Sequence, residues 1–137
     1  MGDDEALDLL DLLYRLSRLV ISDARRSTAD AAGLEMPEFV LLRAIAAETT
    51  SPGDLARELD VHPAAISRTV TQLVKAGLLE RLPSPADSRR FVLALTEQGR
   101  ATTDAIAAKV RPALRARLAA LTQNERTELR SALRRLL

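Results

Sequence analysis

The sequence contains no cysteine, and only 2% of its residues are aromatic. Without a thiol, disulfides, thiolate metal sites and cysteine-based redox sensing are excluded. With so few rings, the core must be built from aliphatic side chains, chiefly Leu, Ala, Val and Ile. That composition favours helices over a β-sandwich.

Features of an enzyme are also scarce. There is one histidine, no Gly-rich phosphate loop, and no cluster of His and carboxylates at metal-ligand spacing. We therefore predict no catalytic residue, no cofactor and no metal site. The single histidine, His62, is most simply a residue at a helix start that contacts a phosphate.

No apolar run approaches the ~20 residues that span a bilayer. The N-terminus is acidic, MGDDEALDLLD, where a signal peptide would be basic. We expect a soluble, cytoplasmic protein with no membrane partner. At 137 residues the chain has the length of one domain with a substantial core. The net charge of +1 neither requires nor excludes nucleic acid, so the distribution of charge decides.

The segment that organises the chain is predicted to contain two short helices joined by a tight turn. Ser51-Pro52 is a helix-start signal, with a capping residue before a proline, and His62-Pro63 repeats it. Asp60-Val61 lies between the two helices, and we expect Val61 to fill the gap between them. This order is that of a helix-turn-helix.

The second of these helices, Pro63 to Lys75, separates two faces. Its inner face carries Ile66, Val70, Leu73 and Val74. Its outer face is short, polar and basic, without acidic residues, which suits the major groove of DNA but also an ordinary solvated surface. The residues that we predict to contact DNA from this helix are His62, Ala64, Ala65, Ser67, Arg68, Thr71, Gln72 and Lys75.

Residues 78–82 and 91–95 are predicted to be strands joined by the loop PSPADSRR. In the second strand Phe91, Leu93 and Leu95 alternate with smaller residues, so we expect this face to pack on the helices. A cationic hairpin tip beside a recognition helix is placed to enter the adjacent minor groove, which attracts arginine. We predict DNA contacts from the wing residues Ser88, Arg89 and Arg90. Asp87 is expected to orient Arg89 through a forked ion pair.

Helices are predicted on both sides of this segment. Residues 4–32 show leucines at helical spacing, and Gly33 is a C-terminal cap. The leucine surface is wider than one core-facing stripe needs, so it is either the core of a monomer or a surface that a second chain buries. We favour the second chain. Another helix covers residues 37–48.

After the second strand, Thr96 is predicted to cap a helix running from Glu97 to about Ala120, kinked at Pro112. Thr122 to Glu125 is a capping box that starts a last helix. This tail is rich in Arg and the N-terminus is rich in Asp. We predict that these ends pair across subunits of a dimer.

The string DSRRFVLALTEQG resembles the signature of the MarR family of bacterial winged-helix transcription regulators. The segments MPEFVLLRAI and LARELDVHPAAISRTVTQLVKAGLLER resemble the same family in order and spacing, so the resemblance covers nearly the whole chain. It implies a mainly α fold with a small β-wing, forming one domain over residues 1–137. Residues 35–96 would be the winged helix-turn-helix lobe, flanked by dimerisation helices over residues 1–34 and 97–137.

The resemblance also implies a homodimer that represses transcription from double-stranded DNA, with the wing residue Arg89 reaching the minor groove. Such a dimer reads a pseudo-palindrome with half-sites about 10 base pairs apart. Many relatives bind a small aromatic or lipophilic ligand and then release DNA. The alternative is a winged-helix dimer that binds DNA without an effector or acts mainly through protein–protein contacts.

Overall fold

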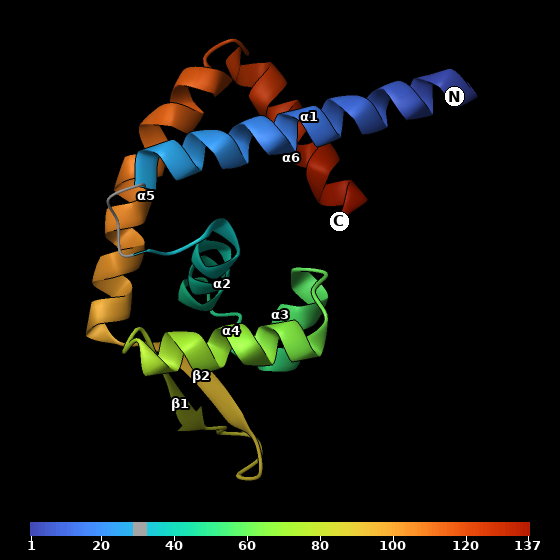
Figure 1. The fold of residues 1–137 in the computed structure, drawn as a ribbon. Coiled ribbons are helices and arrows are strands. Elements are labelled where there is room, and N and C mark those ends of the chain that lie inside the picture. The colour runs from blue at the N-terminus through green and yellow to red at the C-terminus, as the bar shows by residue number, and fades with distance from the viewer. Residues whose placement is uncertain (29–32) are drawn as a thin grey trace. The chain divides into compact units, whose positions relative to one another are not determined.

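We describe the protein from a computed structural model, over residues 1–28 and 33–137. The helices in these ranges are α1 (Asp3–Thr28), α2 (Met36–Ala46), α3 (Pro52–Glu58), α4 (Pro63–Lys75), α5 (Glu97–Leu118) and α6 (Gln123–Leu136), and the strands are β1 (Leu79–Pro83) and β2 (Phe91–Leu95). Figure 1 shows these elements along the chain. The mainly α fold with a small two-stranded sheet is confirmed. The predicted end of the first helix, residues 29–32, lies outside the described residues.

The chain divides into two compact units. Residues 28–107 form one, with α2, α3, α4, the sheet and the first part of α5. Residues 1–27 and 108–137 form the other, with most of α1, the end of α5 and all of α6. The predicted division into a lobe over residues 35–96 and dimerisation helices over residues 1–34 and 97–137 stays a prediction.

The core of the central unit is aliphatic, as the composition requires. Its largest fully buried side chains are leucines from α2, α3, α4 and both strands: Leu41, Leu42, Leu55, Leu73, Leu79 and Leu93. In this unit α3 packs on α4, α4 packs on β1 and α2 packs on β2. The helix-turn-helix and the sheet therefore share one core, which fixes α4 relative to the strands.

Both predicted helix starts in the helix-turn-helix are present. The Ser51 Oγ accepts a hydrogen bond from the backbone N–H of Asp54 at 3.0 Å, and the His62 Nδ1 accepts one from the backbone N–H of Ala64 at 3.1 Å. Asp60 turns the chain between the helices with a φ of 49°. The expectation that Val61 fills the gap between the helices is wrong, because its side chain is 37% exposed.

The two strands form an antiparallel pair in which Leu79 lies opposite Leu95 and Pro83 opposite Phe91. The predicted first strand thus begins one residue later than expected. On the other side of β2, the backbone N–H of Leu93 donates to the carbonyl of Thr50 at 2.8 Å. Only part of the expected apolar face is covered, since Leu93 is buried whereas Phe91 remains 41% exposed.

The end of α4 and the start of α5 meet at a close junction. Gly77 ends α4 with a φ of 77°, as predicted for a left-handed cap. The Thr96 hydroxyl donates to the carbonyl of Gly77 at 2.6 Å and accepts from the backbone N–H of Gly99 at 2.9 Å. One side chain therefore caps α5 and ties it to the end of α4.

The second unit contains most of the exposed large apolar side chains of the described chain. On α1 the exposed large apolar side chains are Leu7, Leu9, Leu10, Leu12, Leu13, Tyr14, Leu16 and Leu19. None of the α6 residues is buried, and its predicted capping box between Thr122 and Glu125 is present. Pro112 lies inside α5, and the kink expected there stays a prediction.

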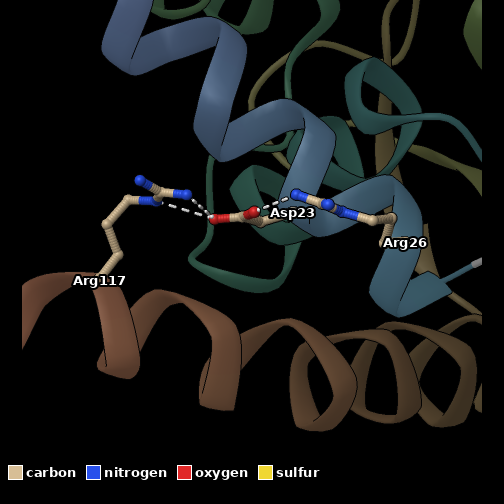
Figure 2. A network of polar contacts seen from close by, with 3 residues as sticks. All are labelled: Asp23, Arg26 and Arg117. Carbon is tan, nitrogen blue, oxygen red and sulfur yellow. Dashed lines mark hydrogen bonds and ion pairs between the residues drawn. The ribbon is translucent and has the colours of Figure 1, made fainter.

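Within the same unit an ion pair joins α1 to α5 (Figure 2). The Asp23 carboxylate lies between two guanidinium groups, with Nη2 of Arg117 at 2.7 Å and Nη2 of Arg26 at 2.8 Å. Hydrogen bonding from Arg117 is the main cause that holds the pKa of Asp23 below its ordinary value, and Arg26 adds to it.

Candidate nucleic-acid interface

The outer face of α4 carries the side chains that we expected to face DNA. The side chains of His62, Ala64, Ser67, Arg68, Thr71, Gln72 and Lys75 are exposed, and Ala65 is half-buried. Ile66, Val70 and Leu73 are buried on the opposite face. The helix thus presents hydroxyl, amide and cationic groups outward while its apolar stripe holds it in the core.

The electrostatics of this helix suit an anionic partner. Its first turn contains no acidic residue, and Lys75 lies in its last turn. The His62 Nδ1 already accepts the cap hydrogen bond, so the proton of the neutral ring lies on Nε2, which can donate to an anion outside the helix. The helix N-terminus adds its own partial positive charge at this point.

The wing is the β1–β2 hairpin, which projects away from α4 with its loop at the far end (Figure 1). Asp87, Ser88, Arg89 and Arg90 are all exposed in this loop. Backbone hydrogen bonds close it, from the N–H of Arg90 to the carbonyl of Asp87 at 3.0 Å and from the N–H of Ser84 to the carbonyl of Arg90 at 3.1 Å. The loop is therefore ordered by its own backbone.

Asp87 does not form the forked ion pair with the Arg89 guanidinium that we expected, so that expectation is wrong. Its Oδ1 accepts from the backbone N–H of Arg89 at 3.0 Å, and its Oδ2 lies 3.8 Å from Nε of Arg90. An aspartate side chain that accepts from the backbone N–H two residues later forms a local turn. The two-residue spacing of Asp87 and Arg89 allows this turn as well as an ion pair. The Arg89 guanidinium makes no ion pair with any residue of the described chain.

Sequence reasoning missed Arg81, which lies at the base of the wing. Its Nη2 donates to the hydroxyl of Thr71 on α4 at 3.2 Å, and its guanidinium carbon lies 5.5 Å from the centre of the Phe91 ring. A small groove of about 110 Å³ opens beside it, lined by Pro52, Gly53, Pro63, Ser67, Val70, Arg81 and Phe91. The one signal in the sequence was a basic residue on the strand that leads into the predicted wing loop.

Other kinds of site are not evident in the described ranges. Among residues 1–28 and 33–137, no group of three or more His and carboxylate side chains is placed to hold a metal ion. No helix in the same ranges is long and apolar enough to cross a membrane.

A helix-turn-helix followed by a hairpin, both in one aliphatic core, defines a winged helix-turn-helix protein. Residues 32–90 match the family model described as MarR family. The HTH-type transcriptional repressor Rv2887 of Mycobacterium tuberculosis is 33% identical over 140 residues, which cover 99% of this chain and 96% of that protein. The chain belongs to the MarR family and is a DNA-binding transcriptional regulator.

Solved structures share the fold. A mutant of Escherichia coli MarR in complex with operator DNA superposes with a TM-score of 0.77 at 26% identity, covering 98% of this chain and 96% of that one. BpsR of Bordetella bronchiseptica superposes with a TM-score of 0.78 at 23% identity over 92% of this chain and 90% of that one. The relatives and the fold are those of transcriptional regulators and not of enzymes.

Proposed function

We propose that the protein is a homodimeric repressor that binds a pseudo-palindromic operator through α4 and the wing. The observation that carries this proposal is the outer face of α4, which is polar, cationic and fully separated from the buried stripe. Arg, Gln, Ser and Thr are the side chains that hydrogen-bond base edges and phosphates in the major groove. The E. coli MarR structure of the same fold contains operator DNA.

The wing supports the same proposal. Arg89 is exposed at the loop, its backbone is fixed by Asp87, and its guanidinium is left for an external anion. Because the loop backbone is already ordered, only the side-chain freedom of Arg89 is lost when its guanidinium enters the narrow, negative minor groove. In this proposal α4 reads bases in the major groove, while Ser88, Arg89 and Arg90 contact the backbone and minor groove beside it.

Dimerisation would be carried by residues 1–34 and 97–137. The exposed leucines of α1 and the unburied α6 are apolar surface that a soluble monomer rarely leaves uncovered. The acidic start of α1 and the arginines of α6 offer opposite charges for the same contact. Exposed ion pairs contribute about 0–1 kcal/mol each, so the leucines would supply most of the affinity.

We also propose that a small-molecule effector releases the DNA. DNA binding by the Bordetella BpsR is regulated by 6-hydroxynicotinic acid, a small aromatic acid.

The alternative is a winged-helix protein that works through protein–protein contacts. A protein-binding face is expected to be rich in large apolar or aromatic side chains at its centre. The exposed face of α4 carries none, and its side chains are small, polar or cationic. This observation favours DNA as the partner of α4.

The test is fluorescence anisotropy on labelled DNA from upstream of the gene, with a scrambled duplex as control, over a salt series. We expect tight binding to the native duplex, much weaker binding to the scrambled one and a steep salt dependence, because phosphate contacts release counterions. Equal, weak binding of both duplexes would contradict sequence-specific recognition at that site.

The wing is tested in the same assay with Arg89→Ala. If Arg89 enters the minor groove, this variant should lose about tenfold or more in affinity, equivalent to about 1.4 kcal/mol. Arg43→Ala removes an exposed arginine from α2 and is the matched control for net charge. Equal binding by the Arg89→Ala and Arg43→Ala variants would refute the role of the wing. Small aromatic acids are then screened for release of the bound duplex.

A further inference from the structure

Arg81 occupies a position in the sheet where an apolar residue would be expected. It lies directly opposite Leu93 in the antiparallel register, so both side chains leave the sheet on the same face. Leu93 is 1% exposed and belongs to the core of the central unit. The neighbouring pair on this face, Leu79 and Leu95, also packs into or against that core. A strand that only covered the core would carry an aliphatic residue at position 81.

The Arg81 side chain leaves the core and reaches α4 at the edge of the sheet. Its guanidinium donates to Thr71 Oγ1 at 3.2 Å and lies over the Phe91 ring at 5.5 Å from the ring centre. Thr71 belongs to the outer face of α4, and Phe91 is the first residue of β2 after the wing loop. One side chain therefore joins the recognition helix, β1 and β2 at the point where the wing leaves the core.

We propose that Arg81 is a positioning residue that fixes the angle of the wing relative to the recognition helix. This inference rests on the proposed function, in which α4 and the wing occupy adjacent grooves of one DNA site. A hairpin attached to the core only at its base can pivot, and a small pivot there displaces the loop by a larger distance. A planar guanidinium that is hydrogen-bonded to one element and held over the ring of another by a cation–π contact resists such a pivot.

The same residue could instead bind a DNA phosphate directly, and the two roles predict different results. If Arg81 binds a phosphate, the affinity losses caused by substituting Arg81 and Arg89 are additive, because the two cations act independently. Lys at position 81 then restores most of the affinity, because it carries the same charge. A positioning role acts through Arg89, so the affinity losses caused by substituting Arg81 and Arg89 are not additive. Lys at position 81 then restores little affinity, because it lacks the planar fork of a guanidinium.

The experiment is a double-mutant cycle with Arg81→Met and Arg89→Ala on the full-length protein, measured by anisotropy on the duplex that the unmodified protein binds. We expect Arg81→Met to weaken binding about tenfold, and Arg89→Ala to add less than about twofold in that background. The DNA affinity of Arg81→Lys should remain close to that of Arg81→Met. Additive losses, or full recovery with Lys, would overturn the proposal in favour of a direct phosphate contact.

A second measurement keeps the test independent of DNA. In the DNA-free protein, ¹⁵N relaxation of the wing amides should show larger fast motion in Arg81→Met than in the unmodified chain. Phe91→Leu removes the ring and adds no charge change, so it should reproduce part of that motion and part of the affinity loss. Unchanged wing relaxation in both variants would overturn the positioning role.

The two proposals fail in different ways. If the unmodified protein does not distinguish its duplex from the scrambled control, the proposed operator recognition fails, while the relaxation experiment still reports on Arg81. If the unmodified protein binds specifically and the cycle is additive, only the role of Arg81 is lost.

Discussion

A side chain at Gly99 would collide with the backbone of Leu78. A Cβ built on Gly99 would lie 1.9 Å from the carbonyl oxygen of Leu78, far inside van der Waals contact. The carbonyl oxygen of Leu78 also accepts a hydrogen bond from the backbone N–H of Thr96 at 3.1 Å, so the two segments cannot separate without breaking that bond. The junction between α4 and α5 requires glycine at this position.

We expect Gly99→Ala to destabilise the protein by about 3 kcal/mol, because the clash is with backbone and not with a side chain that can rotate. Gly53→Ala is the matched control on another helix. The nearest atom to its added Cβ is the Arg57 Nη1 at 3.8 Å, so that substitution should be neutral or slightly stabilising. Urea unfolding monitored by circular dichroism measures both. Equal midpoints for the two variants would contradict the predicted clash.

Thr96 should be sensitive to loss of its hydroxyl. Thr96→Val keeps the shape of the side chain but leaves the carbonyl of Gly77 and the N–H of Gly99 without this partner. We expect a loss of about 2 kcal/mol in the free energy of unfolding. Thr96→Ser retains the hydroxyl and should lose much less. A Val variant as stable as the Ser variant would show that water replaces both hydrogen bonds.

The ion pair between Asp23 and Arg117 predicts a dependence of stability on pH. The pKa of Asp23 is lower in the folded chain than in the unfolded one, mainly through its hydrogen bond to Arg117. Its contribution is therefore complete at pH values well above about 4, where an unfolded aspartate is fully ionised, and is lost as the pH falls through the lower, folded pKa. Asp23→Asn should accordingly reduce stability at pH 7 more than at pH 3.

Urea midpoints at the two pH values measure this difference. Asp11→Asn makes the same change of charge elsewhere on α1 and controls for the net charge of the helix. The prediction is contradicted if Asp23→Asn lowers the urea midpoint by the same amount at both pH values. The ion pair would then contribute no pH dependence to stability.

The proposed dimer depends on α6. Deleting residues 122–137 removes that helix, with its apolar and cationic side chains, and should give monomers or insoluble protein. Sedimentation velocity of the full chain and of the truncated chain over a range of concentrations makes the comparison. A truncated chain that sediments as a stable dimer would place the dimer contact elsewhere.

The sequence predicted the helix-turn-helix well, because its signals are local. The Ser51 and His62 caps and the two faces of α4 depend on residues within one or two helical turns. The left-handed Gly77 is equally local. These features follow from hydrogen bonds and periodicity that a single segment can satisfy by itself.

The misses are contacts that depend on tertiary placement or on a choice between partners. Asp87 was expected to bind the guanidinium of Arg89, but it accepts a hydrogen bond from the backbone N–H of Arg89 instead. Arg81 meets Thr71 and Phe91 only after the strands pair and pack beside α4. The role of Gly99 depends on the carbonyl of a residue 21 positions earlier. No local pattern contains that information.

The carbonyl of Thr50 also protects the wing from other chains. Strand edges with free N–H and C=O groups invite strand addition and aggregation. On β2 the outward N–H of Leu93 is already taken by Thr50, and on β1 the last position is Pro83, which has no N–H to offer. At these two positions the hairpin therefore offers no free N–H to a third strand, which matters most when the protein is concentrated or newly synthesised.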